Sequence, residues 1–284
     1  MPLLQEKLTA PTLPLGVVAR PRLNDAFALN ERVRLLLVQA PSGYGKTTLL
    51  AERLPALEQD AAWLRLDQRD NQPERFLRYW QAAIDTLLRE DALLSPLSEA
   101  ADCVEQLERW LGELPKQRAA CRLVLDEFEH LTHPDILAGL AHWLRHQPPW
   151  LTLTLASRSR PALGLASLRL RGELEEIDLS ALAFDSEEAQ TLCAEQLSFP
   201  PTRVSLERAL RRSGGWVMAL NWLVERTTTR AGFDALVERL NGGHPDFVAW
   251  FDELLAEALP PEERELMLQL GVLERFTPEL MARL

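Results

Sequence analysis

The sequence predicts an α/β protein with a parallel five-stranded sheet and flanking helices, followed by an all-helical part. Three observations predict this class. Over the first 180 residues, short apolar runs alternate with longer stretches of helical periodicity, which is the pattern of repeated βαβ units. Strand-like runs then stop near Phe184. From there to residue 284 only helical patterns follow, so we expect a second region of different architecture.

Five apolar runs are the predicted strands. Each is short and bounded by Pro, Gly, Ser or charged residues, as expected of buried strands in a parallel sheet. They are residues 34–38, 62–66, 121–125, 151–156 and 174–179. The amphipathic stretches between them are long enough to be crossover helices. They are residues 46–58, 73–90, 104–114 and 134–146.

Helix caps and glycine breaks divide the second part. Asp185 precedes an acidic first turn and predicts a helix start, and Thr277 followed by proline predicts another. Gly214 and Gly215 separate two helices, and a second break lies at residues 241–245. We therefore expect an α/β domain at 1–183, a helical subdomain at 184–244 and a further subdomain from 245. Because the last helix has no terminator, we expect the natural protein to continue beyond residue 284.

Composition excludes several function classes. With 31 basic and 42 acidic residues the chain carries a net charge of -11, which disfavours binding to nucleic-acid phosphates or anionic lipid. The three cysteines, Cys103, Cys121 and Cys193, are widely spaced, which argues against a disulfide framework and a zinc knuckle. No run approaches the roughly 18 apolar residues of a membrane span, and the start has no secretion signal. We expect a cytoplasmic protein.

The strongest local pattern is APSGYGKT at residues 40–47, directly after an apolar run and before a helical one. It fits the phosphate-binding loop G-x-x-x-x-G-K-[ST] with alanine at the first position. Backbone N–H groups around Gly43 and Gly45 would face phosphate oxygens at the helix N-terminus. Lys46 would reach the β and γ phosphates, and the Thr47 hydroxyl would bind Mg²⁺. A chance glycine turn would not need the strand and helix on either side. The pattern predicts the fold of a P-loop NTPase.

A second pattern is the apolar strand that ends in Asp126 and Glu127, as in a Walker B motif. Asp126 would hold Mg²⁺ through water, while Glu127 would orient or deprotonate the attacking water. Alternatively, the two carboxylates only end a strand in solvent.

Arg158 follows the next predicted strand. At that strand tip a basic side chain would face the γ phosphate and distinguish ATP from ADP. The alternative is a solvated arginine in the run Arg158-Ser159-Arg160.

These patterns occur together in one known family. The chain resembles the nucleotide-binding module of the large bacterial transcription activators of the maltose-regulator type, which are LuxR-family members and signal-transducing P-loop ATPases with numerous domains. The resemblance covers nearly the whole chain. The matching pieces are residues 17–23, APSGYGKTTL, residues 66–71 with 74–76, LVLDEFEHL, LASRSRP, and residues 215–220.

The resemblance implies roles for individual residues. The segment from Arg20 to Leu23 would pack around adenine, and the segment at Gly215 would close over the nucleotide. Where related proteins have G-x-P, this chain has Val217. The residues expected to bind nucleotide are Val18, Arg20, Pro21, Arg22, Ser42, Gly43, Tyr44, Gly45, Lys46, Thr47, Thr48, Arg158, Gly215 and Trp216. Those expected to act in hydrolysis are Lys46, Asp126 and Glu127, with Thr47 and Asp126 as metal ligands.

The resemblance also implies a function. Such a module would bind ATP or ADP with Mg²⁺ and hydrolyse ATP slowly. ADP would hold a closed monomer, and inducer with ATP would release it to self-associate and activate promoters. Residues 245–284 would begin a winged-helix subdomain. Inducer sensing and DNA binding would lie beyond this chain, so we expect neither DNA binding nor membrane contact from it.

Two other functions fit parts of the sequence. The chain can be a nucleotide-binding interaction module that does not hydrolyse ATP. It can also be a P-loop kinase acting on a small molecule, for which the basic stretch at 203–212 is the one candidate lid.

Overall fold

The structure is a computed structural model of the chain and describes residues 3–27, 32–57, 60–88, 93–98, 102–116, 118–241 and 243–270. It contains a five-stranded sheet in the order β2-β3-β4-β1-β5, in which every neighbouring pair is parallel. The predicted sheet is therefore confirmed. The strands are β1 (Leu35–Gln39), β2 (Asp60–Arg65), β3 (Cys121–Asp126), β4 (Leu151–Ser157) and β5 (Leu174–Ile177).

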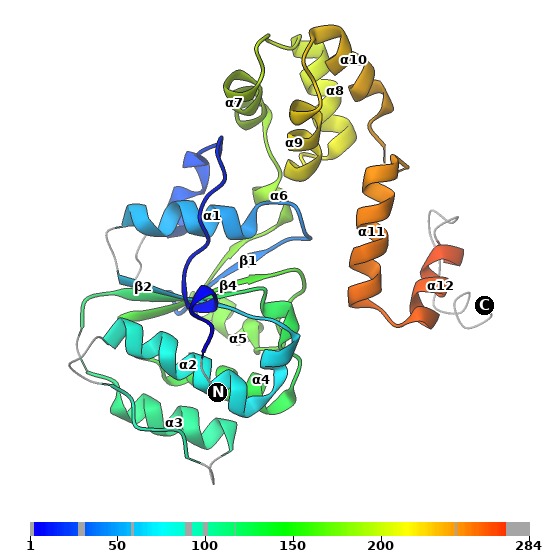
Figure 1. Cartoon of the computed structure of the whole chain (residues 1–284). Helices are drawn as coiled ribbons and strands as arrows, with labels where there is room; N and C mark the ends of the chain where they lie inside the picture. The colour runs from blue at the N-terminus through cyan, green and yellow to red at the C-terminus, as the bar shows by residue number, and fades with distance from the viewer. Residues whose placement is uncertain are drawn as a thin grey trace.

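Side chains alternate between the two faces of the sheet, and each face has its own apolar cluster. Leu37 and Leu125 belong to the cluster covered by α2 to α5, whereas the adjacent Val38 and Val124 belong to the cluster under α1. Figure 1 shows α1 on one face of the sheet and α2 to α5 on the opposite face. These helices are α1 (Lys46–Arg53), α2 (Pro73–Leu88), α3 (Cys103–Glu113), α4 (Pro134–His146) and α5 (Leu165–Leu170).

The last predicted strand ends early. The sequence predicts one strand over residues 174–179, but β5 stops at Ile177. The Asp178 side chain instead accepts a hydrogen bond from the Ala181 N–H at 3.0 Å and begins the short helix α6 (Leu179–Leu182). The apolar residues after Asp178 thus continue a helix rather than a strand. The other four strands begin and end within two residues of the prediction.

The predicted helix at 46–58 is also shorter. The α-helix ends at Arg53 and tightens into the 3-10 helix η3 (Leu54–Leu57). Pro55 explains this end, because it has no N–H to donate to the preceding turn. The helix predicted at 73–90 is observed to residue 88, and residues 89 and 90 lie outside the described residues. Further 3-10 helices are η1 (Gln5–Leu8), η2 (Pro21–Phe27), η4 (Gln68–Asn71) and η6 (Phe128–His130).

The second part is helical throughout its described residues, as predicted. Asp185 caps the first helix by accepting from the N–H groups of Glu187 and Glu188 at 2.9 Å each. The helices are α7 (Ser186–Gln196), α8 (Arg203–Ser213), α9 (Val217–Glu225), α10 (Arg230–Arg239), α11 (Pro245–Ala258) and α12 (Pro261–Leu270). The helix start predicted at Thr277 lies outside the described residues. None of the helices that the structure describes has the length and apolar character to cross a membrane.

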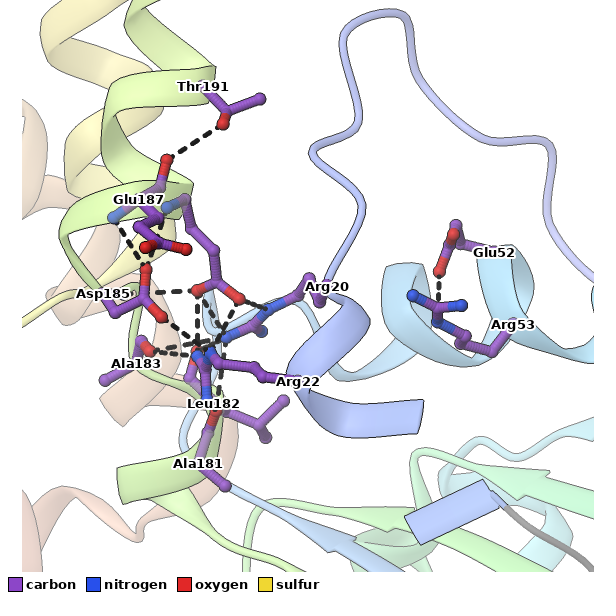
Figure 2. A network of polar contacts seen from close by, with 11 residues as sticks. Arg20, Arg22, Glu52, Arg53, Ala181, Leu182, Ala183, Asp185, Glu187 and Thr191 are labelled. Carbon is purple, nitrogen blue, oxygen red and sulfur yellow. Dashed lines mark hydrogen bonds and ion pairs between the residues drawn. The ribbon is translucent and has the colours of Figure 1, made fainter. Parts of the chain in front are cut away.

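Helices α7 to α10 pack around a separate apolar cluster beyond the α1 face of the sheet (Figure 1). A buried ionic network joins this cluster to the sheet domain. Arg20 and Glu188 are each 5% exposed, and the Arg20 Nε lies 3.1 Å from a Glu188 carboxylate oxygen. Arg20 also donates to the Leu182 carbonyl at 2.8 Å, and Arg22 donates to Glu188 at 2.9 Å and to the Ala183 carbonyl at 2.8 Å. Figure 2 shows the side chains of Arg20 and Arg22 both reaching the segment 181–183, which leads into α7.

Replacing Glu188 tests the network. Glu188→Ala would leave the Arg20 guanidinium buried without its counter-ion, so we expect the free energy of unfolding to fall by about 3–5 kcal/mol. Urea denaturation followed by far-UV circular dichroism measures it. Glu187→Ala is the matched control, because Glu187 is exposed on the same helical turn. Equal losses in both variants would contradict the prediction.

Candidate functional site

The predicted phosphate and metal residues meet at one edge of the sheet. The loop at residues 40–45 connects β1 to α1, Asp126 ends β3, and Arg158 directly follows β4. Because parallel strands end at the same edge, these three segments lie together although they are far apart in sequence. The edge is thus lined by a backbone loop, a carboxylate and a guanidinium.

The backbone of the loop depends on two glycines. Gly43 and Gly45 have φ values of 81° and 77°, in the left-handed region that glycine tolerates best. Gly45 precedes the first turn of α1, so the helix N-terminus points at the loop. The Lys46 ammonium donates to the carbonyls of Ala40 at 2.7 Å and Pro41 at 3.1 Å. Burial lowers the pKa of Lys46, and the Glu129 carboxylate opposes this effect.

The side-chain oxygens of Thr47 and Asp126 lie together beside the loop. The Thr47 Oγ1 lies 3.0 Å from both carboxylate oxygens of Asp126, which is 1% exposed. Burial raises the pKa of Asp126 to about 6. Hydroxyl and carboxylate oxygens suit Mg²⁺, which keeps several waters and phosphate ligands. The described residues contain no group of three or more His, Cys, Asp or Glu side chains that would hold a metal without such additional ligands.

Glu127 sits on a strained backbone. Its φ of 58° is the one positive value at a non-glycine position in the described ranges, and such strain is often found at functional sites. Its carboxylate lies 2.8 Å from Arg65 Nη2 and 3.6 Å from His130 Nε2. The nearby His130 imidazole, and then the hydrogen bond donated by Arg65, lower the pKa of Glu127. Glu127 is therefore an anion at neutral pH.

Sequence reasoning missed Arg65 and His130. Arg65 is the last residue of β2 and pairs with Asp126 in the ladder, so the strand order places it beside Glu127. No local motif marks it.

Arg158 is paired rather than solvated. Its Nε lies 2.8 Å from Glu129 Oε1, and its backbone N–H donates to Glu129 Oε2 at 3.1 Å. Glu129 was not among the predicted site residues. It follows β3 within η6, beside the end of β4.

A cavity of about 170 Å³ lies between α1 and the helical part. Of the predicted nucleotide residues it is lined by Val18, Arg20, Tyr44, Gly45 and Thr48. Pro21 and Arg22 are not among its lining residues. The opposite wall comes from the helical part and was missed at the sequence level. It includes Phe184, Leu192, Val217 and Asn221. Mostly apolar walls with a few polar groups are typical of ligand cavities.

The helical part also contacts the phosphate loop itself. The Trp216 Nε1 donates to the Ser42 carbonyl at 3.0 Å, and the Met218 N–H donates to the Gly43 carbonyl at 3.0 Å. A Cβ on Gly43 would lie 2.4 Å from the Trp216 Nε1. The neighbouring Gly215 is equally close-packed, since a Cβ there would lie 2.8 Å from a backbone oxygen at the start of the helical part. The segment at Gly215, which was expected to close over the nucleotide, thus contacts the loop through one indole N–H and one backbone N–H.

The chain was compared with protein families and with known proteins. Residues 30–162 match the family model described as AAA domain. The chain is 32% identical over 289 residues to the HTH-type transcriptional regulator MalT of Yersinia enterocolitica, covering 99% of this chain and 32% of that protein. MalT of Yersinia pestis matches with the same identity and coverage. The chain spans about a third of the length of these relatives.

Among solved structures, a mutant of RuvB from Thermotoga maritima aligns with a TM-score of 0.44 at 16% identity, covering 89% of this chain and 76% of that one. Cdc6p of Pyrobaculum aerophilum aligns with a TM-score of 0.49 at 12% identity, covering 80% and 65%. Likenesses at this level carry no argument about function.

The two loop glycines can be compared directly. Gly43→Ala and Gly45→Ala both place alanine in the left-handed region, at a cost of about 1–2 kcal/mol. A Cβ at Gly43 would also collide with Trp216, whereas one at Gly45 has open space. We expect Gly43→Ala to lower the free energy of unfolding by about 1–3 kcal/mol more than Gly45→Ala. Urea denaturation without nucleotide checks this, and similar losses would contradict it.

The buried Asp126 predicts a pH dependence. Its folded pKa of about 6 lies above the ordinary 3.8, so the folded protein binds this proton more tightly than the unfolded chain does. The stability that it contributes at low pH is lost as pH rises from about 4 to about 6. Asp126→Asn should therefore match the wild type near pH 4 and exceed its free energy of unfolding by about 2–3 kcal/mol above pH 7.

Chemical denaturation of the nucleotide-free protein at a series of pH values measures this difference. Asp25→Asn, at an exposed position, controls for the loss of one carboxylate. If the difference in free energy of unfolding between Asp126→Asn and the wild type does not grow with pH, the pKa of Asp126 is not raised by burial.

Proposed function

Residues 30–162 form an AAA-type P-loop nucleotide-binding domain, and from this premise we propose that the chain is the ATP- and ADP-binding switch module of a signal-dependent transcriptional activator. One observation carries the proposal: the helical part is hydrogen-bonded to the phosphate loop through Trp216 and Met218. Binding or loss of a phosphate at the loop would therefore act directly on the position of the helical part.

The chain's own residues provide the nucleotide contacts. Lys46 and the loop N–H groups would bind the phosphates, and Thr47 with Asp126 would hold Mg²⁺. The metal, when bound, would neutralise charge on the phosphate oxygens. Glu127 would orient the attacking water. Because its carboxylate is paired with Arg65 and His130, it would first have to leave both partners, which supports slow hydrolysis.

The switch would act by holding two parts together. The cavity has one wall from the sheet domain, including Tyr44 and Thr48, and one from the helical part, including Val217 and Asn221. ADP bound there would contact both walls and favour the closed arrangement. ATP with inducer would favour the open one, in which the protein self-associates.

The remaining steps are proposed from the similarity to MalT. The chain spans about a third of that regulator, so we assign inducer sensing and promoter binding to other parts of a longer protein. The net charge of -11 supports this division, because it disfavours DNA contact by this part. A role in transcription would be carried out in the cytoplasm.

The proposed subdomain boundaries follow the predicted ones at 183 and 244. The apolar cluster of α7 to α10 is distinct from those of the sheet, which supports the first boundary. At the second, Trp216 packs against the α11 rings of Phe247, Trp250 and Phe251, with centroid separations of 5.4, 5.2 and 5.8 Å. We propose that α11 begins a winged-helix subdomain which rests on the residue that contacts the phosphate loop.

A second candidate is a nucleotide-binding interaction module without hydrolysis. The pairing of Glu127 with Arg65 and His130 favours it, because a carboxylate that did not leave these two partners would not activate water. A small-molecule kinase has no such support. In the stretch 203–212, Arg203 pairs with Glu207, and Arg208 pairs with Glu238 within the helical part.

Two substitutions test the proposal. Lys46→Ala removes a charged phosphate ligand, so we expect the dissociation constants for Mg-ADP and Mg-ATP to rise about 10- to 100-fold. Glu127→Gln should keep both affinities and reduce phosphate release about 100-fold or more. Calorimetry and a phosphate-release assay measure these quantities.

Lys116→Ala, at an exposed lysine, controls for the loss of one positive charge. Unchanged ATP affinity in Lys46→Ala would refute nucleotide binding at this loop. Bound nucleotide with no phosphate release by the wild type would instead favour the non-hydrolytic module.

A further inference from the structure

Glu129 uses both carboxylate oxygens on a single residue. One oxygen lies 2.8 Å from the Arg158 Nε, and the other accepts the Arg158 backbone N–H at 3.1 Å. The Glu129 side chain is 14% exposed and that of Arg158 is 34% exposed, so the pair is only partly screened by solvent. Glu129 thereby fixes both the backbone and the guanidinium at the end of β4.

The pair lies at the sheet edge that carries the phosphate loop, because η6 follows β3 and Arg158 follows β4. Burial lowers the pKa of the Lys46 ammonium, while the Glu129 carboxylate raises it, as do Asp126 and Glu127. Arg158 acts on the same ammonium in the opposite direction. Glu129 therefore adds a negative charge, outside the pair Asp126 and Glu127, at the sheet edge where terminal phosphates would bind.

We propose that Glu129 is a specificity-determining residue of the nucleotide site, which holds Arg158 away from the terminal phosphate of a nucleoside triphosphate and so favours the diphosphate. This inference rests on the proposed function, because it concerns the same site. It adds the residue that sets the preference between the two nucleotides.

The reason is electrostatic. A γ phosphate beside Lys46 would bring negative charge close to the Glu129 carboxylate, while a diphosphate would end one phosphate earlier. Arg158 would attract the γ phosphate, but its Nε is engaged by Glu129 at 2.8 Å and the carboxylate offsets part of its charge. Glu129 therefore raises the free energy of the triphosphate complex much more than that of the diphosphate complex.

Glu129→Gln tests the inference. The amide has nearly the same shape but no charge, so we expect triphosphate to bind about five- to tenfold more tightly, while the dissociation constant for Mg-ADP changes less than twofold. Calorimetric titration with Mg-ADP and with the Mg complex of a non-hydrolysable ATP analogue measures both constants. The readout is their ratio, which a general loss of stability would not change selectively.

Glu176→Gln is the matched control. Glu176 loses the same charge, but it pairs with Arg160 and Arg169 at β5, so the ratio should stay at the wild-type value. Arg158→Met combined with Glu129→Gln should remove most of the gain, because the released guanidinium is absent. Glu129→Ala gives the same ratio test if Glu129→Gln does not fold.

An unchanged ratio in Glu129→Gln, or equal tightening of both nucleotides, would overturn the inference. Absence of Mg-ADP binding by the wild type would overturn the proposed function instead. The two failures are therefore distinguishable.

Discussion

The buried ion pair between Arg20 and Glu188 fixes the arrangement on which the site depends. A guanidinium that is 5% exposed must have all its charge and its N–H groups satisfied within the protein. Here this requires the segment before η2, the carbonyls at 181–183 and the start of α7 to meet at one point. Arg20 also lines the cavity. The residue that joins the sheet domain to the helical part is therefore also part of the cavity wall.

Charge at the sheet edge is arranged in two neighbouring pairs. Arg65 with Glu127 and Arg158 with Glu129 both join an arginine at a strand end to a carboxylate that follows β3. Each pair keeps a charged group in a defined position close to the loop. A nucleotide that binds there would compete with existing ionic contacts rather than bind free side chains. Its affinity would therefore depend on how many phosphates it carries.

The sequence was informative where the physical cause is local. Buried strands are continuous apolar runs, and the phosphate loop is one contiguous segment, so both were predictable. The predicted end of β5 was wrong because an aspartate in this sequence context can either follow a longer strand or cap a helix. In the structure Asp178 caps a helix. The partners Arg20 and Glu188 lie 168 residues apart and Arg158 and Glu129 lie 29 apart, so only strand order and tertiary packing bring them together.

The contacts of Trp216 and Met218 have a consequence for the inner surface of the phosphate loop. The Ser42 carbonyl and the Gly43 N–H belong to one planar trans peptide, in which the two groups point in opposite directions. The same holds for the Gly43 carbonyl and the Tyr44 N–H. By binding the two oxygens from outside, the helical part sets the rotation of both peptide planes and so aims two amide protons inward. Separation of the two parts would leave these planes free to turn, and the loop would lose the orientation of its amide protons without any change in its own side chains.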